Sequence, residues 1–209
     1  GCLEGGSPAG VNATERSSTT GAVLWDGALV LAAALAAEPS RWGCGPGRRV
    51  VELGAGVGAL PGTVAALLGA AKVVLTDLPP VIGAPVLREN LEANLSTEEL
   101  HHVELCGLVW GEPLPAPACA PDLVLASECV YDLGLVEPLI GTLAELLAGS
   151  PAGAAALASF DRSIGRSVAY AAFEAGCRER FERFEEVQCE GASYRSDTCV
   201  VYELARPRK

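Results

Sequence analysis

A glycine-rich turn between two apolar segments is the feature that most limits how this chain can fold. The run Val-Val-Glu-Leu over 50–53 is too short for a helix and predicts a buried strand, and Gly54-Ala55-Gly56-Val57-Gly58 follows at once. Alternate glycines let the backbone turn tightly and leave no Cβ between the main chain and a ligand above it. A helix over 59–71 and a second strand over 72–75, followed by Asp77, complete a βαβ unit of the nucleotide-binding type.

The details of this turn favour a cationic ligand over a diphosphate. GAGVG departs from GxGxxG because its third glycine comes one residue early, and Glu52 lies just before the turn. A dinucleotide places its pyrophosphate at the amino terminus of the following helix, where a nearby carboxylate would repel it. The sulfonium and α-amino groups of S-adenosylmethionine are positive. We therefore predict that the turn holds S-adenosylmethionine, and we rank an NAD-dependent Rossmann dehydrogenase below it.

Length and charge limit the class of protein. The 209 residues fit one α/β domain, with a flexible leader rich in Gly, Ser, Thr and Pro expected over 1–20 and a single domain over 21–209. The 26 acidic and 15 basic side chains leave a formal net charge of −11. Nucleic acid is a poor partner for such a chain, because no basic surface offsets the phosphates, whereas basic protein segments are favoured. We see no apolar stretch of transmembrane length and expect no membrane partner.

The cysteines indicate a reducing compartment. Eight of them are scattered along the chain without a CxxC motif, which predicts neither a zinc site nor a disulfide framework. We therefore expect a cytoplasmic protein, and a monomer. The chain contains no methionine, so a targeting segment upstream stays open.

Two tryptophans are candidates for cofactor contact. Trp25 precedes an apolar helix expected over 28–37 with Asp26 as its cap, and its indole is placed to cover the methionine end of the cofactor. A further helix is expected over 81–94. Trp110 comes where the third strand, around 103–106, should end, and its ring there can stack on adenine.

The end of the fourth strand, over 122–127, carries the candidate acceptor residues. In an open parallel sheet, ligands bind outside the carboxyl ends of the strands at the topological switch point, where the first and fourth strands are neighbours. Ser127, Glu128 and Tyr131 are therefore expected to face the transferred methyl group. The alternative is that Glu128 is a solvated acid and Tyr131 a packing aromatic.

The rest of the chain is predicted to be scaffold. We expect a helix over 135–147, a strand over 154–160, a helix over 162–183 and a terminal hairpin of strands over 184–190 and 198–204. The only histidines are His101 and His102 in a polar segment, so a histidine-based catalytic triad is excluded.

Taken together, the motifs resemble those of the seven-β-strand protein-lysine methyltransferases, over about residues 21–206. The resemblance is closest to the group that methylates valosin-containing protein, an AAA ATPase, and to relatives that act on Hsp70-type chaperones and elongation factors. The motifs that carry it occur in this order: Leu24-Trp25-Asp26, VELGAGVG, VVLTDLP, Glu89-Asn90 to Asn94, Trp110-Gly111, the strand end DxVLxSExVY, and YRSD over 194–197.

The resemblance implies a Rossmann-like seven-stranded sheet, mostly parallel with a reversed last strand, with helices on both faces. It implies S-adenosylmethionine as cofactor, S-adenosylhomocysteine as product, a protein substrate and no metal. Glu128 and Tyr131 are assigned to the acceptor channel, with no general base. The cofactor contacts that it implies are Trp25, Glu52, Gly54, Ala55, Gly56, Asp77, Leu78, Trp110 and Ser127.

Two departures from the family pattern and two other functions stay open. Glu128 stands where the motif usually begins with Asp, and Ser127 stands where alanine is common, so methyl transfer is better supported than lysine as its acceptor. A small-molecule N-methyltransferase would be expected to carry an added lid or domain over the site, and the chain has no spare residues after Asp77 for one. A non-catalytic cofactor-binding module would be expected to carry a damaged glycine turn or tyrosine motif, and both are intact.

Overall fold

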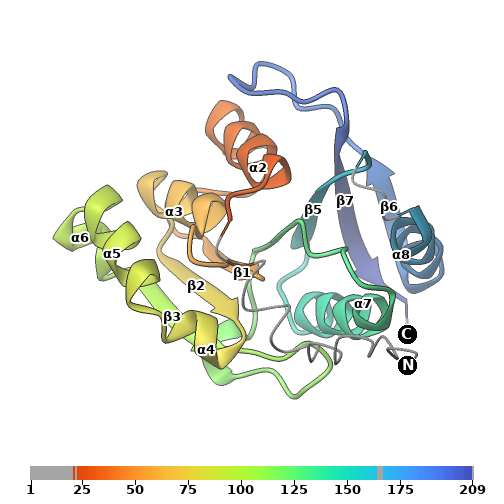
Figure 1. Cartoon of the computed structure of the whole chain (residues 1–209), viewed down its shortest axis with the longest axis horizontal. Helices are drawn as coiled ribbons and strands as arrows, with labels where there is room; N and C mark the ends of the chain where they lie inside the picture. The colour runs from red at the N-terminus through yellow and green to blue at the C-terminus, as the bar shows by residue number, and fades with distance from the viewer. Residues whose placement is uncertain (1–20, 22, 164–166, 209) are drawn as a thin grey trace, which may run out of the picture.

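The computed structural model describes residues 21, 23–163 and 167–208, which form one seven-stranded sheet with helices on both faces (Figure 1). The leader predicted over 1–20 lies outside the described residues. The strand order across the sheet is β3-β2-β1-β4-β5-β7-β6. The strands are β1 Arg49–Leu53, β2 Lys72–Asp77, β3 Val103–Gly107, β4 Leu123–Ser127, β5 Ala155–Asp161, β6 Phe181–Glu186 and β7 Cys199–Pro207.

The sheet has its switch point at β1. This strand pairs in parallel with β2, where Leu53 is opposite Thr76, and with β4, where Leu53 is opposite Ala126. β7 runs antiparallel to both of its neighbours, β5 and β6. The predicted Rossmann-like sheet with a reversed last strand is thereby confirmed. The terminal hairpin is confirmed as well, but its first strand begins at Phe181, inside the segment predicted as a helix over 162–183.

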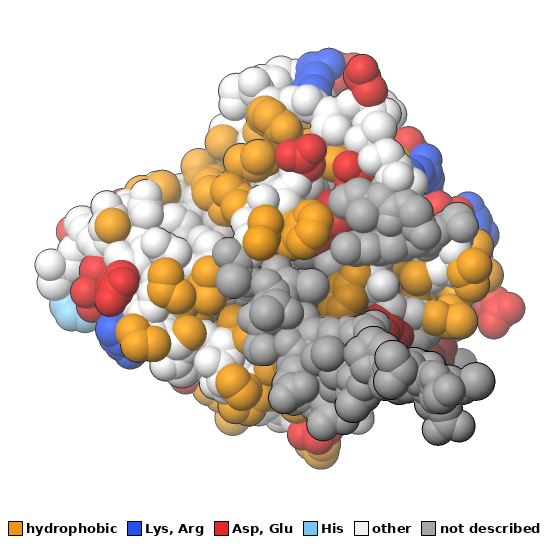
Figure 2. Space-filling model, in the orientation of Figure 1, with side chains coloured by type: hydrophobic (Ala, Val, Ile, Leu, Met, Phe, Trp, Pro, Cys, Tyr) orange, Lys and Arg blue, Asp and Glu red, His pale blue; other side chains and the backbone are white. Residues whose placement is uncertain are grey.

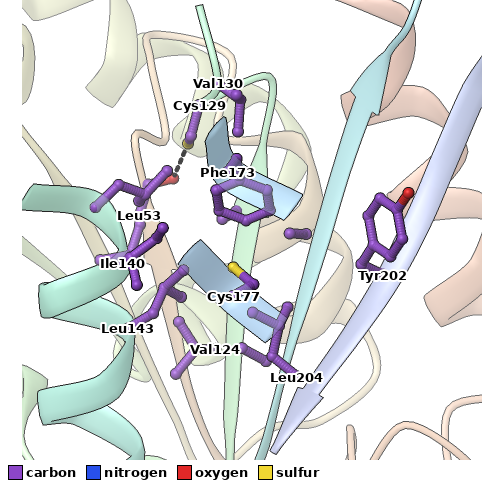
Figure 3. Close-up of a cluster of buried hydrophobic side chains, with 14 of the residues drawn as sticks. Leu53, Val124, Cys129, Val130, Ile140, Leu143, Phe173, Cys177, Tyr202 and Leu204 are labelled. Carbon is purple, nitrogen blue, oxygen red and sulfur yellow. Dashed lines mark hydrogen bonds between the residues drawn. The ribbon is translucent and has the colours of Figure 1, made fainter. Parts of the chain in front are cut away.

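Alternating side chains of the inner strands build two cores, one on each face of the sheet. Strands that are buried on both faces read as continuous apolar runs, which is the pattern of β1 and β4. Val50 packs with helices α2 and α3, whereas Val51 packs with α7 and α8 on the other face. Figure 3 shows the second of these cores, in which Phe173 and Cys177 lie near Ile140 and Leu143.

The helices follow the predicted order with three corrections. The segment 81–94 is two helices, because Pro85 forces the preceding Ala84 into an extended conformation (φ −68°, ψ 128°). The helix after the glycine turn stops short of 71, since Gly69 takes a left-handed φ of 82°. The helices are α2 Asp26–Ala37, α3 Leu60–Leu67, α4 Pro79–Ile82, α5 Pro85–Asn94, α6 Thr97–Leu100, α7 Leu133–Ala148 and α8 Ser167–Arg180, with a 3₁₀ turn η1 Ala116–Ala118.

The third correction concerns the start of α2. Trp25 occupies the N-cap position and no side chain caps the helix there, so the predicted capping by Asp26 is wrong. Asp26 instead accepts a hydrogen bond from the Tyr194 hydroxyl (3.2 Å), which joins α2 to the segment before β7. Within the described part of the chain, no helix is long and apolar enough to cross a membrane.

Candidate active site

A cavity of about 380 Å³ opens at the carboxyl ends of the central strands. Its walls come from the segment before α2, the glycine turn, the end of β2, the turn after β3 and the end of β4. In the orientation of Figure 1, several hydrophobic side chains are visible on the molecular face and the visible Lys and Arg side chains lie at its margins (Figure 2). The predicted site residues that line the cavity are Trp25, Gly54, Ala55, Gly56, Asp77, Leu78, Trp110, Ser127, Glu128 and Tyr131.

The glycine turn needs its glycines for both conformation and space. Gly54 and Gly56 have φ angles of 63° and 59°, in the left-handed region that residues with a Cβ rarely adopt. A Cβ on Gly56 would lie 2.8 Å from the carbonyl oxygen of Gly21, and one on Gly54 would lie 2.8 Å from Sγ of Cys129. The Gly21 carbonyl also accepts the amide of Val57 at 2.8 Å, so the segment before α2 is bonded directly to the turn.

Asp77 joins the end of β2 to this turn. Its Oδ2 accepts the amide of Gly56 at 2.8 Å, and its Oδ1 accepts the amide of Leu78 at 2.6 Å. Burial raises the pKa of the Asp77 carboxyl, although the two amides partly oppose the shift. Each carboxylate oxygen accepts more than one hydrogen bond, so Asp77 keeps capacity for ligand hydroxyls in the cavity that it lines.

Glu52 does not take the position predicted for it. Its side chain is 1% exposed, is absent from the cavity wall and accepts the amide of Gly62 in α3 at 2.8 Å. Burial, opposed by the Gly62 amide and reinforced by the charge of Asp77, raises the pKa of Glu52 to about 8. Because side chains alternate between the two faces along β1, the Glu52 side chain lies beneath the glycine turn. Its carboxyl is mostly neutral there at pH 7. The structure therefore does not support the predicted contact between Glu52 and the cofactor, or the argument that its charge repels a diphosphate.

Glu128 is held at the end of β4 by backbone groups from two other elements. Its Oε1 accepts the amide of Gly27 in α2 at 3.2 Å and the amide of Asp161 in β5 at 2.9 Å. Its own amide donates to the carbonyl of Ser159 at 2.7 Å, and its φ is 53°. Because Glu128 is only 8% exposed, the alternative of a solvated acid is wrong. Tyr131 and Ser127 line the cavity beside it.

The sequence analysis assigned no role to several positions that shape the site. A Cβ on Gly27 would lie 2.5 Å from Oε1 of Glu128, and one on Gly62 would lie 2.5 Å from Oε2 of Glu52, so each glycine makes room for a carboxylate. Nδ2 of Asn90 donates to the Val57 carbonyl at 2.9 Å and ties α5 to the glycine turn. Only Asn90 had a signal, since it belongs to the motif Glu89-Asn90 to Asn94, although no contact was assigned to it.

Cys129 also lines the cavity, behind the glycine turn. Its thiol donates to the Leu53 carbonyl at 3.2 Å, as the dashed line in Figure 3 shows. Burial, together with the charges of Asp77, Glu52 and Glu128, raises the pKa of this thiol well above its usual value. The site thus contains a neutral thiol that packs as a small apolar group.

The arrangement fits S-adenosylmethionine. Gly54 and Gly56 leave room that a Cβ would fill, Asp77 offers acceptors for ribose hydroxyls, and Trp25 and Trp110 add aromatic surface to the wall. The stacking of either indole on the cofactor stays a prediction. Among the residues that the structure describes, His, Cys, Asp and Glu form no group of three or more that could hold a metal ion.

Comparison with solved structures supports the fold. Mitomycin 7-O-methyltransferase MmcR superposes with a TM-score of 0.59 at 16% identity, over 86% of this chain and 54% of that one. The N-methyltransferase NodS from Bradyrhizobium japonicum gives a TM-score of 0.53 at 16% identity, over 93% and 96% of the two chains. At such identities the likeness concerns the methyltransferase fold alone.

Sequence relatives are more specific. Protein N-lysine methyltransferase METTL21A of Danio rerio is 40% identical over 129 residues, 61% of this chain and 56% of the relative. Protein N-terminal and lysine N-methyltransferase EFM7 of Eremothecium gossypii is 37% identical over 146 residues, 65% and 53% of the two chains. The chain thus spans about half the length of these curated relatives. A family model described as lysine methyltransferase matches residues 11–170, and the chain therefore belongs to the lysine methyltransferase family, whose cofactor is S-adenosylmethionine.

Proposed function

We propose that this chain transfers a methyl group from S-adenosylmethionine to the ε-amino group of a lysine in a protein. The observation that carries the proposal is a single cavity with Asp77 and the glycine turn at one part of its wall and Glu128 and Tyr131 at another. The first set suits a nucleoside, and the second presents an acid and an aromatic ring to an acceptor. The family membership and the lysine-directed relatives support the same reading.

The residues around the cofactor have distinct roles in this proposal. Asp77 accepts the ribose hydroxyls, Trp110 stacks on the adenine and Trp25 covers the methionine end, while the glycine turn lets the backbone approach the ligand. When it is bound, the cofactor supplies a methyl group on a positively charged sulfur. The chain holds acceptor and donor in line, which is the main way a site speeds such a substitution.

At the acceptor end, Glu128 and Tyr131 orient the incoming amine. The amine must be neutral to attack, and its proton leaves to water before transfer. A carboxylate nearby favours the protonated form and raises the pKa of the amine, so Glu128 serves binding and alignment better than deprotonation. We assign no general base.

Two other acceptors compete with a lysine side chain. An N-terminal α-amine is one, because EFM7 is named for both activities. It has a pKa of about 8 against about 10.4 for lysine, so more of it is neutral at pH 7. A small molecule is the other, since the solved structures that share this fold include mitomycin 7-O-methyltransferase MmcR. We rank the small molecule lower because Val23 and Leu24 at the cavity wall are 55% and 50% exposed, which suits a site that meets a larger surface.

We also propose the setting in which the chain works. The net charge of −11 favours a basic protein segment as partner and disfavours nucleic acid. Following the family resemblance, we propose that this segment belongs to a chaperone, an AAA ATPase or a translation factor. We further propose that the chain acts as a monomer. Buried thiols such as Cys44 and Cys177 fit the reducing cytoplasm.

The test is methylation of native proteins. The enzyme is incubated with isotope-labelled S-adenosylmethionine and a lysate of its own organism, and the labelled residue is identified by mass spectrometry. A reaction without the enzyme is the control, and Tyr131→Ala is a matched variant expected to transfer less label. We expect label on lysine in one or a few proteins. Label confined to α-amines or to small molecules would replace lysine as the acceptor, and no label above the control would refute transfer.

A further inference from the structure

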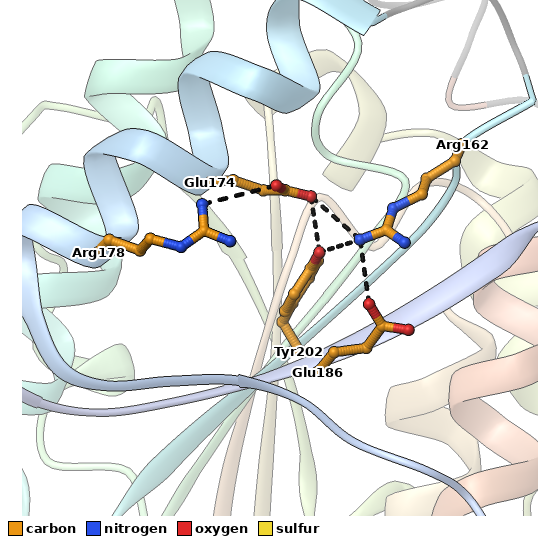
Figure 4. Close-up of polar contacts among 5 residues, drawn as sticks. All are labelled: Arg162, Glu174, Arg178, Glu186 and Tyr202. Atoms are coloured by element: carbon orange, nitrogen blue, oxygen red, sulfur yellow. Dashed lines mark hydrogen bonds and ion pairs between the residues drawn. The ribbon is translucent and has the colours of Figure 1, made fainter.

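A charged network lies at the sheet edge formed by β5, β7 and β6. Nη2 of Arg162 lies 3.1 Å from Oε1 of Glu174 and 3.1 Å from Oε2 of Glu186, and it also donates to the Tyr202 hydroxyl. That hydroxyl donates in turn to Glu174 at 2.6 Å, and Arg178 pairs with the same carboxylate (Figure 4). The network therefore joins α8, β6 and β7 to the residue that follows β5.

This network is more rigid than an ordinary surface ion pair. Isolated exposed pairs contribute little, whereas several groups held in one partly buried network reinforce one another. Tyr202 is 3% exposed and its ring stacks on Phe184 with centroids 4.5 Å apart. Burial, together with the hydrogen bond to Glu174, raises the pKa of Tyr202 to about 12, so its hydroxyl is a donor throughout the neutral range.

Main-chain bonds connect the network to the cavity. Asp161, directly before Arg162, donates its amide to Oε1 of Glu128 at 2.9 Å. The carbonyl of Asp161 accepts the Tyr170 hydroxyl, and the amide of Arg162 donates to the Thr198 carbonyl at 3.0 Å. The peptide between Asp161 and Arg162 is thus hydrogen-bonded through both its carbonyl and its amide, and it directly follows the peptide whose amide binds Glu128.

Glu128 needs such external ties. Its φ of 53° is uncommon for a residue with a Cβ and persists only where the surroundings enforce it. Among the described residues, Gly27 in α2 and Asp161 each donate an amide to its carboxylate. Movement of the end of β5 would therefore release an amide that orients the carboxylate in the cavity wall.

We propose that Arg162 is a positioning residue for Glu128: by anchoring the end of β5 to Glu174, Glu186 and Tyr202, it keeps the Asp161 amide on the Glu128 carboxylate and so sets the acceptor side of the cavity. The consequence for methyl transfer rests on the function proposed above, whereas the link between Arg162 and Glu128 is a property of the fold.

The test compares Arg162→Ala and Tyr202→Phe with Arg183→Ala. Arg183 is a matched control, because it is 48% exposed against 42% for Arg162 and pairs with Glu185 and Glu203 on the same hairpin. For each variant, amide resonances of Gly27 and Asp161, the Kd for S-adenosylmethionine, and kcat and KM for the methylated protein are measured. Tyr202→Phe removes one hydroxyl and keeps the ring, so it covers the case in which Arg162→Ala fails to fold.

We expect the two network variants to shift both amide resonances. They should also lower kcat/KM for the acceptor by about tenfold to a hundredfold, since a misplacement of about 1 Å is enough for this. The Kd for the cofactor should stay within about twofold of wild type, because the proposed function assigns Glu128 to the acceptor side of the cavity. Arg183→Ala should change none of these.

Unchanged amide resonances in both network variants would overturn the proposal. A loss of cofactor affinity equal to the loss in kcat/KM would also overturn it, because it would indicate general damage. If the wild-type chain methylates nothing, the proposed function fails, and the amide resonances still decide whether Arg162 positions Glu128.

Discussion

Gly27→Ala is the substitution that most directly tests how Glu128 is held. Alanine is normally the better helix residue by about 0.5–1 kcal/mol, and Gly27 lies in the first turn of α2. Here, however, the new Cβ would lie 2.5 Å from Oε1 of Glu128 and 3.1 Å from its Cγ and Cδ. The carboxylate would have to leave a site in which Gly27 and Asp161 both donate to it.

The magnitude follows from those two hydrogen bonds. Bonds to a charged group contribute about 1.5–3 kcal/mol each, and partial loss of the pair outweighs the gain in helix propensity. We expect a net destabilisation of about 1–3 kcal/mol, which lowers the Tm by roughly 2–10 °C for a chain of this size. Thermal unfolding followed by circular dichroism measures the change. Gly141→Ala in α7 is the control, because nothing lies within 4 Å of the added Cβ, and it should be neutral or stabilising.

A double-mutant cycle separates the clash from other effects of the alanine. In a Glu128→Ala background the carboxylate is gone, so Gly27→Ala should cost nothing or raise the Tm. Equal destabilisation in both backgrounds would refute the reasoning, because the cost would then come from somewhere other than Glu128. Stabilisation in the wild-type background would refute it as well.

Three further predictions concern the cavity and its surroundings. Asp77→Ala should weaken S-adenosylmethionine binding in calorimetry by about tenfold or more, as expected for loss of a hydrogen bond of about 1.5–3 kcal/mol to a charged group; undiminished affinity would place the ribose elsewhere. Tyr131→Ala should lower kcat/KM for the acceptor far more than it weakens cofactor binding, and equal losses would remove Tyr131 from the acceptor channel. The pKa of Glu52 is raised to about 8 in the folded chain, so the buried carboxyl favours the protonated form. Its contribution to stability is complete below the unfolded pKa of about 4.3 and is lost as the pH rises to about 8. Urea unfolding should therefore show wild type losing a few kcal/mol between about pH 5 and pH 8 relative to Glu52→Gln, and parallel pH profiles would contradict the burial of this carboxyl.

The sheet and the cavity wall were predictable because their signals are local. An apolar run followed by alternate glycines specifies a strand and its turn, and strand ends in a parallel sheet converge on one edge. Asp77, Trp110 and Tyr131 could therefore be placed together although they are far apart in the chain. The break in the helix over 81–94 was missed, although its signal is local too, since a residue before proline, here Ala84, avoids the helical region.

The direction of buried carboxylates was not predictable in the same way. Glu52 occupies a strand buried on both faces, so the apolar pattern locates it without telling which side it faces. Its partner Gly62 is ten residues away, and the amide that Asp161 gives to Glu128 comes from 33 residues further along. Such pairings depend on how the helices pack on the sheet, and a short stretch of sequence does not carry that information.

The burial of Cys129 has a chemical consequence for a chain that binds an alkylating cofactor. A thiolate is a strong nucleophile, and one in the wall of this cavity would compete with the acceptor for the methyl group. Burial, together with the neighbouring acids, raises the pKa of the Cys129 thiol and keeps the proton on sulfur, and the thiol donates that proton to the Leu53 carbonyl. Cys129 is therefore expected to be a poor nucleophile towards the cofactor and to resist thiol-directed reagents at neutral pH.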